Sequence, residues 1–231
     1  KINISERTVR KGSLAPLLET DYINWNQTGF YNKACPLDPS TGQNALTGCV
    51  ATAMAQILRY HKYPARGWGS HSYQHPYYGT ISADFGATTY NWNNMPGALT
   101  ADNEDVAKIL FHTGVSVNMN YGLSESSASV ANVPLALSEY FGYKDARFFD
   151  SDYFAWGTND YQLALIEELE NGRPVFYELR GNPGHTVVVD GYDGDYFHIN
   201  FGWGGSENGY FLLSGTQFAS VYQFGFRGNS V

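Results

Sequence analysis

The chain has 231 residues and a hydrophobic content of 43%, which suits a folded domain and excludes a disordered polymer. Its formal net charge of -8 offers no basic surface for nucleic acids or anionic membranes, so we expect neither as a partner. No apolar run in the sequence approaches the ~20 residues that a membrane-spanning helix requires.

The first strong pattern begins near residue 49. Residues 1–48 carry many turn residues without sustained periodicity, which is typical of a segment that wraps around a core. From Cys49 to His61 apolar residues recur at helical spacing, so we predict a largely buried helix there. Thr47 is positioned to be its N-cap, which would place Gly48 and Cys49 in the first helical turn.

Helices dominate the first part of the chain and strands the last. Residues 65–100 favour a long excursion with short strands, and the spacing then predicts helices over 102–113, 134–141 and 159–171. Beyond Gly172 the expected strands cover 174–179, 185–190, 196–201, 210–213 and 221–226. This order indicates an α+β fold with segregated lobes. Within a single domain we place an N-terminal segment and helical lobe at about 1–172 and a sheet lobe at about 173–231.

Cys49 is the first candidate for chemistry. A thiol in the first turn of a helix lies near unpaired amides and the positive end of the helix dipole, which favour the thiolate. Gly48 before it allows a substrate backbone to come close. Cysteine is also among the most buried residue types, so a packing role stays open on these grounds. Cys35 could form one disulfide with Cys49, but unequal roles suit a domain of this size better.

A thiol nucleophile needs a base, and His185 is the best placed histidine. It opens a buried strand after a Gly-rich turn, and such junctions often carry catalytic groups, although a structural histidine fits the pattern too. His61 lies on the nucleophile helix, roughly 18 Å from Cys49 at about 1.5 Å per residue, and is therefore structural. His71 and His75 have metal-ligand spacing but no carboxylate or thiolate near them in the sequence, so we expect no metal.

Four more side chains could complete such a site. Asn200 ends the strand after that of His185, so its amide could orient the imidazole, with Phe201 and Trp203 shielding the contact from water. The same aromatic and glycine-rich turn is also compatible with ordinary packing. Gln27 could donate to an oxyanion, although its position in the sequence does not by itself direct it toward the thiol.

Several segments taken together are similar to the streptopain family of cysteine peptidases. The similar segments are 44–57, 60–64, 90–94, 115–122, 184–185 and 200–205. The resemblance covers nearly the whole chain. It implies a papain-like α+β fold, in which a helical lobe carries the nucleophile and an antiparallel sheet lobe carries the histidine.

The resemblance also implies a role for each residue of the catalytic motifs. Cys49 corresponds to the nucleophile of a cysteine endopeptidase, and His185 to its general base and acid. Asn200 corresponds to the orienting amide and Gln27 to the oxyanion donor.

Substrate contacts are implied less directly. The residues expected to contact the substrate are Trp203, Gly184 and Ser127. The chain departs from the family at Phe201, where the family has Trp, and around 213–220, where a glycine-rich loop is shorter. Substrate preference therefore does not transfer.

Members of the streptopain family are made as secreted bacterial zymogens. The resemblance thus implies a mature or nearly mature secreted enzyme and virulence factor, and a leader removed before the polar segment at residues 1–10. It implies protein or peptide substrates, the enzyme's own propeptide as inhibitor, a monomer and no cofactor. Cys35 has no counterpart in the catalytic motifs, so we expect a free thiol or an occasional disulfide partner.

Two other functions stay open at this level. An acyl transferase on the same fold would resolve the thioester with an amine instead of water. A catalytically inactive papain-like module could bind glycans or proteins through its Tyr and Trp surface. Intact Cys49, His185 and Asn200 argue against the inactive module.

Overall fold

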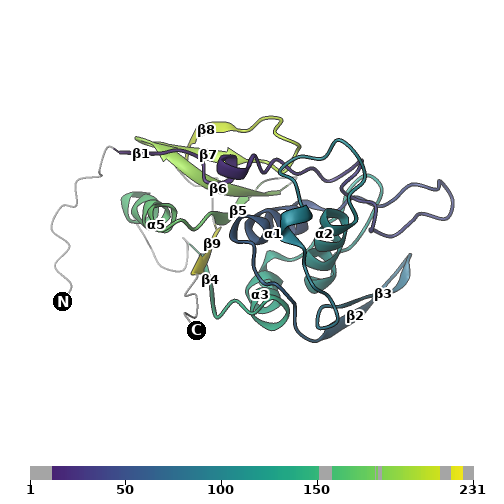
Figure 1. The fold of residues 1–231 in the computed structure, drawn as a ribbon. Helices are drawn as coiled ribbons and strands as arrows, with labels where there is room; N and C mark the ends of the chain where they lie inside the picture. Colours follow the sequence, from purple (N-terminus) through teal and green to yellow (C-terminus); the bar gives the residue numbers. More distant parts are fainter. Residues whose placement is uncertain (1–11, 151–157, 180, 182–183, 214–219, 226–231) are drawn as a thin grey trace.

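The computed structural model describes residues 12–150, 158–179, 181, 184–213 and 220–225. In Figure 1 a group of helices with a small hairpin lies on one side, and a β-sheet with one helix lies on the other. Helix α1 (Cys49–His61) runs between the two groups. The molecule is therefore an α+β structure with a helical lobe and a sheet lobe, as the sequence predicts.

The helical lobe contains α1, α2 (Glu104–Ser116) and α3 (Val133–Phe141), with short 3-10 helices at η2 (Trp92–Asn94) and η3 (Val130–Asn132). The excursion between α1 and α2 forms an antiparallel hairpin of β2 (Ser70–His75) and β3 (Gly79–Asp84). Asn103 caps α2 by accepting from Val106 N at 3.0 Å. None of the helices that the structure describes is long and apolar enough to cross a membrane.

The sheet lobe is built on a seven-stranded antiparallel sheet. Its strands follow the order β4 (Asp145–Asp150), β9 (Ser220–Gly225), β5 (Val175–Leu179), β6 (His185–Asp193), β7 (Tyr196–Asn200) and β8 (Gly209–Leu212). The short β1 (Ser13–Leu14) pairs with the last residues of β6, and the 3-10 helix η1 (Leu18–Asp21) follows it. Helix α5 (Thr158–Glu170) completes the lobe.

Strands β5 and β6 are apolar on both faces, because each face packs against a helix. Phe176 and Val188 belong to the core that contains α1, whereas Tyr177 and Val187 belong to a second core with Leu169 of α5. Strands buried on both faces lose the simple alternation of apolar and polar residues. The sheet thus separates a core between the lobes from a core beneath α5.

The predicted helices and strands all occur, with ends shifted by a few residues, and residue 226 lies outside the described residues. Two strands of the sheet, β1 and β4, precede Gly172 and lie in segments where the sequence pattern predicts no strand. Helix α5 also precedes Gly172, yet it packs on the sheet. The chain therefore does not pass from one lobe to the other at a single point. Strand β4 pairs with the distant β9, and such a pairing leaves no local signal.

A buried polar cluster fastens the N-terminal segment to the sheet. The carboxylate of Asp190, fully buried on β6, accepts from Leu18 N at 2.9 Å and bonds His198 Nδ1 at 2.6 Å. The Asp190 carbonyl accepts from Leu17 N at 2.8 Å. Because η1 leads into the segment that carries Gln27, this cluster also positions one side of the cleft described below.

We predict that Asp190→Ala lowers the free energy of unfolding by about 3–5 kcal/mol, because His198 and the Leu18 N–H lose their buried acceptor. Urea unfolding followed by tryptophan fluorescence measures the change. Asp193→Ala on the same strand is the control, because Asp193 is exposed and its loss should cost less than about 0.5 kcal/mol. Equal effects of the two substitutions would contradict the anchoring role.

Candidate active site

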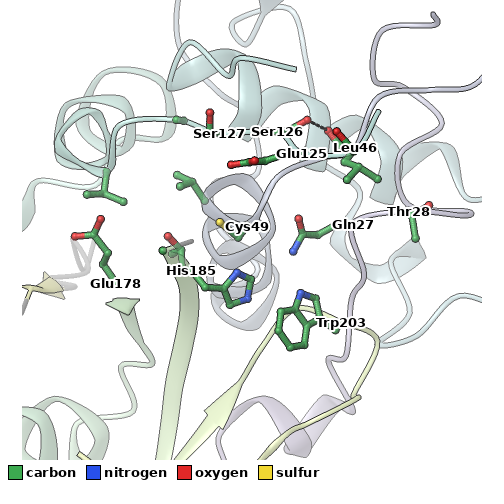
Figure 2. A pocket seen from close by; sticks show the side chains of 16 residues that line it. Gln27, Thr28, Leu46, Cys49, Glu125, Ser126, Ser127, Glu178, His185 and Trp203 are labelled. Carbon is green, nitrogen blue, oxygen red and sulfur yellow. Dashed lines mark hydrogen bonds between the residues drawn. The ribbon is translucent and has the colours of Figure 1, made fainter. Parts of the chain in front are cut away.

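A cleft of about 600 Å³ opens between the start of α1 and the sheet. Residues of both lobes line it, from the segment before α1, the first turn of α1, the loop around residue 126 and the start of β6. Figure 2 shows Cys49 at the centre of the cleft, with His185 below it and Gln27 beside it. The residues predicted from the sequence that line the cleft are Gln27, Cys49, Ser127, Gly184, His185 and Trp203.

Gly48 determines where Cys49 begins the helix. Gly48 is the N-cap of α1 with φ of 85°, and a Cβ there would lie 2.8 Å from the side chain of Met119. The prediction that Thr47 is the N-cap is wrong, because the Thr47 hydroxyl bonds that of Thr52 at 2.8 Å. Cys49 is therefore the first helical residue, and its N–H is one of the amides without a partner in the helix. These amides and the helix dipole favour negative charge on the sulfur.

Cys49 and His185 act on each other electrostatically, and their pKa values shift in opposite directions. Burial raises the pKa of the Cys49 thiol, but the bond and charge of His185, with two bonds from Thr186, bring this pKa below its ordinary value. Burial lowers the pKa of His185, but the bond and charge of Cys49 and the bond to the Phe201 carbonyl bring it above its ordinary value. Both shifts favour the thiolate–imidazolium pair over the neutral pair.

The backbone carbonyl of Phe201 holds the ring of His185. Its oxygen accepts from His185 Nε2 at 2.9 Å, so Nε2 carries a proton and Nδ1 is the nitrogen left for the thiol. The contact follows from the sheet, because β6 begins at His185, β7 is its neighbour, and Phe201 directly follows β7. Since a carbonyl only accepts, the bond is kept when the ring becomes imidazolium.

The amide of Asn200 does not take the orienting role that the sequence predicts for it. Its Nδ2 donates to the Ile23 carbonyl at 2.9 Å, and its Oδ1 accepts from Gln56 Nε2 at 3.2 Å and from Gly202 N at 3.0 Å. The side chain is only 2% exposed, because it points into the protein between α1 and the N-terminal segment. Asn200 thus fixes the turn after β7, and it acts on the imidazole only through the position of the Phe201 carbonyl.

Two aromatic rings surround the imidazole. The ring centroids of His185 and Phe201 are 6.1 Å apart with an interplanar angle of 10°, and those of His185 and Trp203 are 4.6 Å apart. Trp203 is 40% exposed, so one part of its ring faces solvent while another part packs against the imidazole. The contact that these rings can shield is the one between His185 and the Phe201 carbonyl, not one with Asn200.

Gln27 reaches the cleft because its segment is fastened to α1. The neighbouring Trp25 is fully buried and donates its backbone N–H to Gln56 Oε1 at 3.0 Å. The Gln27 carbonyl accepts from Thr47 N at 3.1 Å, close to the start of the helix. Figure 2 shows the Gln27 side chain directed toward Cys49. Its amide and the N–H at the helix start are therefore placed to stabilise an oxyanion beside the sulfur.

The sequence predicts substrate contacts at Ser127, Gly184 and Trp203, and all three residues line the cleft. Ser127 is held in place by backbone bonds with Asn120 of 2.8 and 3.2 Å. Residues 182–183 and 214–219, which include the shortened loop, lie outside the described residues.

Among the residues of the lining that sequence reasoning missed are Glu125, Glu178 and Thr186. The N–H and hydroxyl of Thr186 help to lower the pKa of Cys49, and its position directly after His185 was an available signal. Glu178 lies opposite Thr186 across β5 and β6, so only the strand register reveals it.

The second cysteine takes no part in this site. Cys35 and Cys49 are both free thiols, which is one of the two states expected for Cys35. Cys35 is 4% exposed, and burial raises its pKa to about 12, so it is a poor nucleophile. Within the part of the chain that the structure describes, no three His, Cys, Asp or Glu side chains converge as metal ligands.

A thiol at the start of a buried helix, facing a histidine at the start of a strand in the other lobe, is the arrangement of papain-like cysteine peptidases. The chain belongs to the peptidase C10 family, which it matches over residues 25–211. It is 34% identical to streptopain of Streptococcus pyogenes over 229 residues, covering 89% of this chain and 57% of streptopain.

Another relative and a solved structure are also similar to this chain. The thiol protease/hemagglutinin PrtT of Porphyromonas gingivalis is 38% identical over 217 residues, covering 87% of this chain and 25% of PrtT. The chain thus spans little more than half of streptopain and a quarter of PrtT. Its structure is similar to active interpain A of Prevotella intermedia, with a TM-score of 0.84 and 30% identity over 96% of this chain and 100% of that one. The predicted family and the papain-like fold are confirmed.

We predict that Phe201→Ala lowers kcat/KM for peptide hydrolysis and moves the acidic limb of its pH profile to higher pH. This limb follows formation of the Cys49 thiolate, whose pKa is held down by His185. When water reaches the carbonyl bond, the ring of His185 is held less firmly, so the pKa of Cys49 rises and the limb shifts upward.

Kinetics over a pH series measure this shift. Phe201→Trp is the matched control, because a larger ring covers the bond at least as well and should preserve the profile. An unchanged acidic limb in Phe201→Ala would mean that the ring only packs.

Proposed function

We propose that this chain is a cysteine endopeptidase that hydrolyses peptide bonds in proteins through a thioester on Cys49. The single observation that carries the proposal is the pairing of Cys49 and His185 in one cleft, in which the thiol lies at a helix start and the ring is held by a carbonyl. Membership of the peptidase C10 family supports the same class of reaction.

In the acylation step, the Cys49 thiolate attacks the carbonyl carbon of the peptide, and the carbonyl oxygen becomes an oxyanion. The amide of Gln27 and the backbone N–H of Cys49 donate to this oxygen. The imidazolium of His185 then gives its Nδ1 proton to the leaving nitrogen, the C–N bond breaks, and the thioester remains.

In the deacylation step, neutral His185 takes a proton from water at Nδ1, and the hydroxide attacks the thioester carbon. The C–S bond breaks, the acid product leaves, and the thiolate–imidazolium pair is restored. Throughout both steps the Phe201 carbonyl keeps Nε2 protonated and limits rotation of the ring.

We further propose that the chain is the mature or nearly mature part of a secreted bacterial zymogen, with its own propeptide as inhibitor. Its coverage of only 57% of streptopain supports a longer precursor. A prointerpain A fragment, 31% identical with a TM-score of 0.83 over 97% of this chain and 76% of that one, supports a proenzyme form. The catalytic pair and both oxyanion donors come from one chain, so a monomer without cofactor suffices.

We predict that Cys49→Ala abolishes both peptide hydrolysis and labelling by a thiol-directed peptidyl epoxide, because the substitution removes only the nucleophilic sulfur. Circular dichroism should show an unchanged fold. Cys35→Ala is the control that should keep labelling, because the Cys35 thiol is buried with a pKa of about 12. Turnover or labelling that persists in Cys49→Ala would overturn the proposed function.

We predict that Gln27→Ala lowers kcat by about 10²-fold with little change in KM, the effect expected for loss of one oxyanion donor. Steady-state kinetics on one peptide substrate separate the two constants. Thr28→Ala serves as a comparison, because Thr28 lies next to Gln27 in the cleft lining and carries no amide. A change confined to KM would show that Gln27 binds the ground state instead.

A further inference from the structure

The register of β5 and β6 brings a carboxylate into the cleft. Glu178 of β5 pairs with Thr186 of β6, and directly opposed residues of an antiparallel pair point to the same face of the sheet. Both residues line the cleft with Cys49. Because Thr186 directly follows His185 and lines the cleft with Cys49, Glu178 is the cross-strand neighbour of a residue beside the catalytic pair.

On the same face of these strands, the neighbouring cross-strand pair, two residues away, is apolar. Phe176 opposes Val188, and both pack in the core with α1. Glu178 therefore stands where the core between the lobes ends and the cleft begins, and its side chain is half-buried. The packing of the lobes does not require a charged group at that position, so the carboxylate contributes charge to the cleft.

Glu178 lies at the end of the cleft away from Trp203. Figure 2 shows Glu178 and Trp203 on opposite sides of His185, with the Glu178 carboxylate directed up into the cleft. In the proposed mechanism His185 protonates the leaving amine, and the ring of Trp203 packs against His185 with the ring centroids 4.6 Å apart. The amine side of the substrate thus lies toward Trp203, and the acyl side lies toward Glu178.

The rest of the lining suits a long side chain with a cationic end. Val50, Ala128 and Val130 supply apolar surface, and among the described lining residues no Lys or Arg is present. A lysine or arginine side chain can pack its methylene groups on apolar surface while its charged end reaches a carboxylate.

We propose that Glu178 gives this peptidase a preference for a lysine or arginine on the acyl side of the scissile bond. The inference rests on the proposed function and names the substrate class for the same cleft. It does not depend on whether Glu178 also has a partner within the protein, because a carboxylate has several acceptor positions and can accept from more than one donor. The net charge of -8 adds a weak long-range attraction for basic substrates.

Peptide libraries varied at one position at a time on each side of the scissile bond test the proposal. For each variant, the measured quantity is the ratio of kcat/KM for a lysine peptide to that for the uncharged norleucine peptide of similar length. We expect this ratio to exceed one at an acyl-side position of the unmodified enzyme and to fall about tenfold in Glu178→Gln, mainly through KM. Glu178→Lys should favour aspartate or glutamate at that position.

Two comparison variants make the result specific. Glu167→Gln removes an exposed carboxylate on α5, outside the cleft, and should keep the ratio. Glu125→Gln removes the other carboxylate of the lining. An equal fall of the ratio in Glu125→Gln would overturn the assignment to Glu178, because the preference would then come from the general acidity of the cleft.

The remaining outcomes separate this inference from the proposed function. Hydrolysis of norleucine and lysine peptides at equal rates by the unmodified enzyme would overturn the inference and leave the peptidase activity in place. Hydrolysis of no library peptide, together with absence of epoxide labelling at Cys49, would overturn the proposed function and the inference with it. Labelling by the epoxide also confirms that each variant is folded before its ratio is compared.

Discussion

The contact between the first turn of α1 and the start of β6 is the constraint on which the rest of the structure depends. Cys49 and His185 come from different lobes, so the opposite shifts of their pKa values exist only while the lobes are packed in this arrangement. Phe176 and Val188 maintain it, because they place the sheet directly in the core that contains α1. The chemistry of the thiol is therefore a property of the packing between lobes and not of the helix alone.

The nucleophile helix and the strand that begins at His185 could be predicted from the sequence, because both leave local patterns of apolar and β-branched residues. The cap could not, since Thr47 has a favourable side chain but Gly48 has the backbone conformation that the turn needs. The place of β4 in the sheet and the direction of Glu178 also escaped prediction. Both depend on pairing between strands that are distant in the sequence or on its register.

The sequence predicts that the amide of Asn200 orients His185, whereas in the structure the Phe201 carbonyl bonds the ring. This difference also has a physical reason. Residue types reveal side-chain donors and acceptors, whereas every residue has a carbonyl, so a backbone group that orients a ring has no sequence signature. Asn200 directly precedes Phe201, but its buried amide bonds groups of three separate segments. An amide with so many fixed partners is a structural anchor, and the carbonyl that it positions is left to hold the imidazole.

Thr52 of α1 connects the two turns that present the sulfur and the imidazole. Its hydroxyl donates to the Gly48 carbonyl at 2.9 Å, within the turn that precedes the nucleophile. Gly202 has φ of 69°, and a Cβ there would lie 3.0 Å from the Thr52 methyl group. Because this contact is tight and a positive φ is strained for other residues, a larger residue at 202 would disturb the turn that carries the Phe201 carbonyl. Close packing of the Gly202 turn against α1 thus helps to set the distance between the catalytic groups, and the carbonyl hydrogen bond then sets the orientation of the ring.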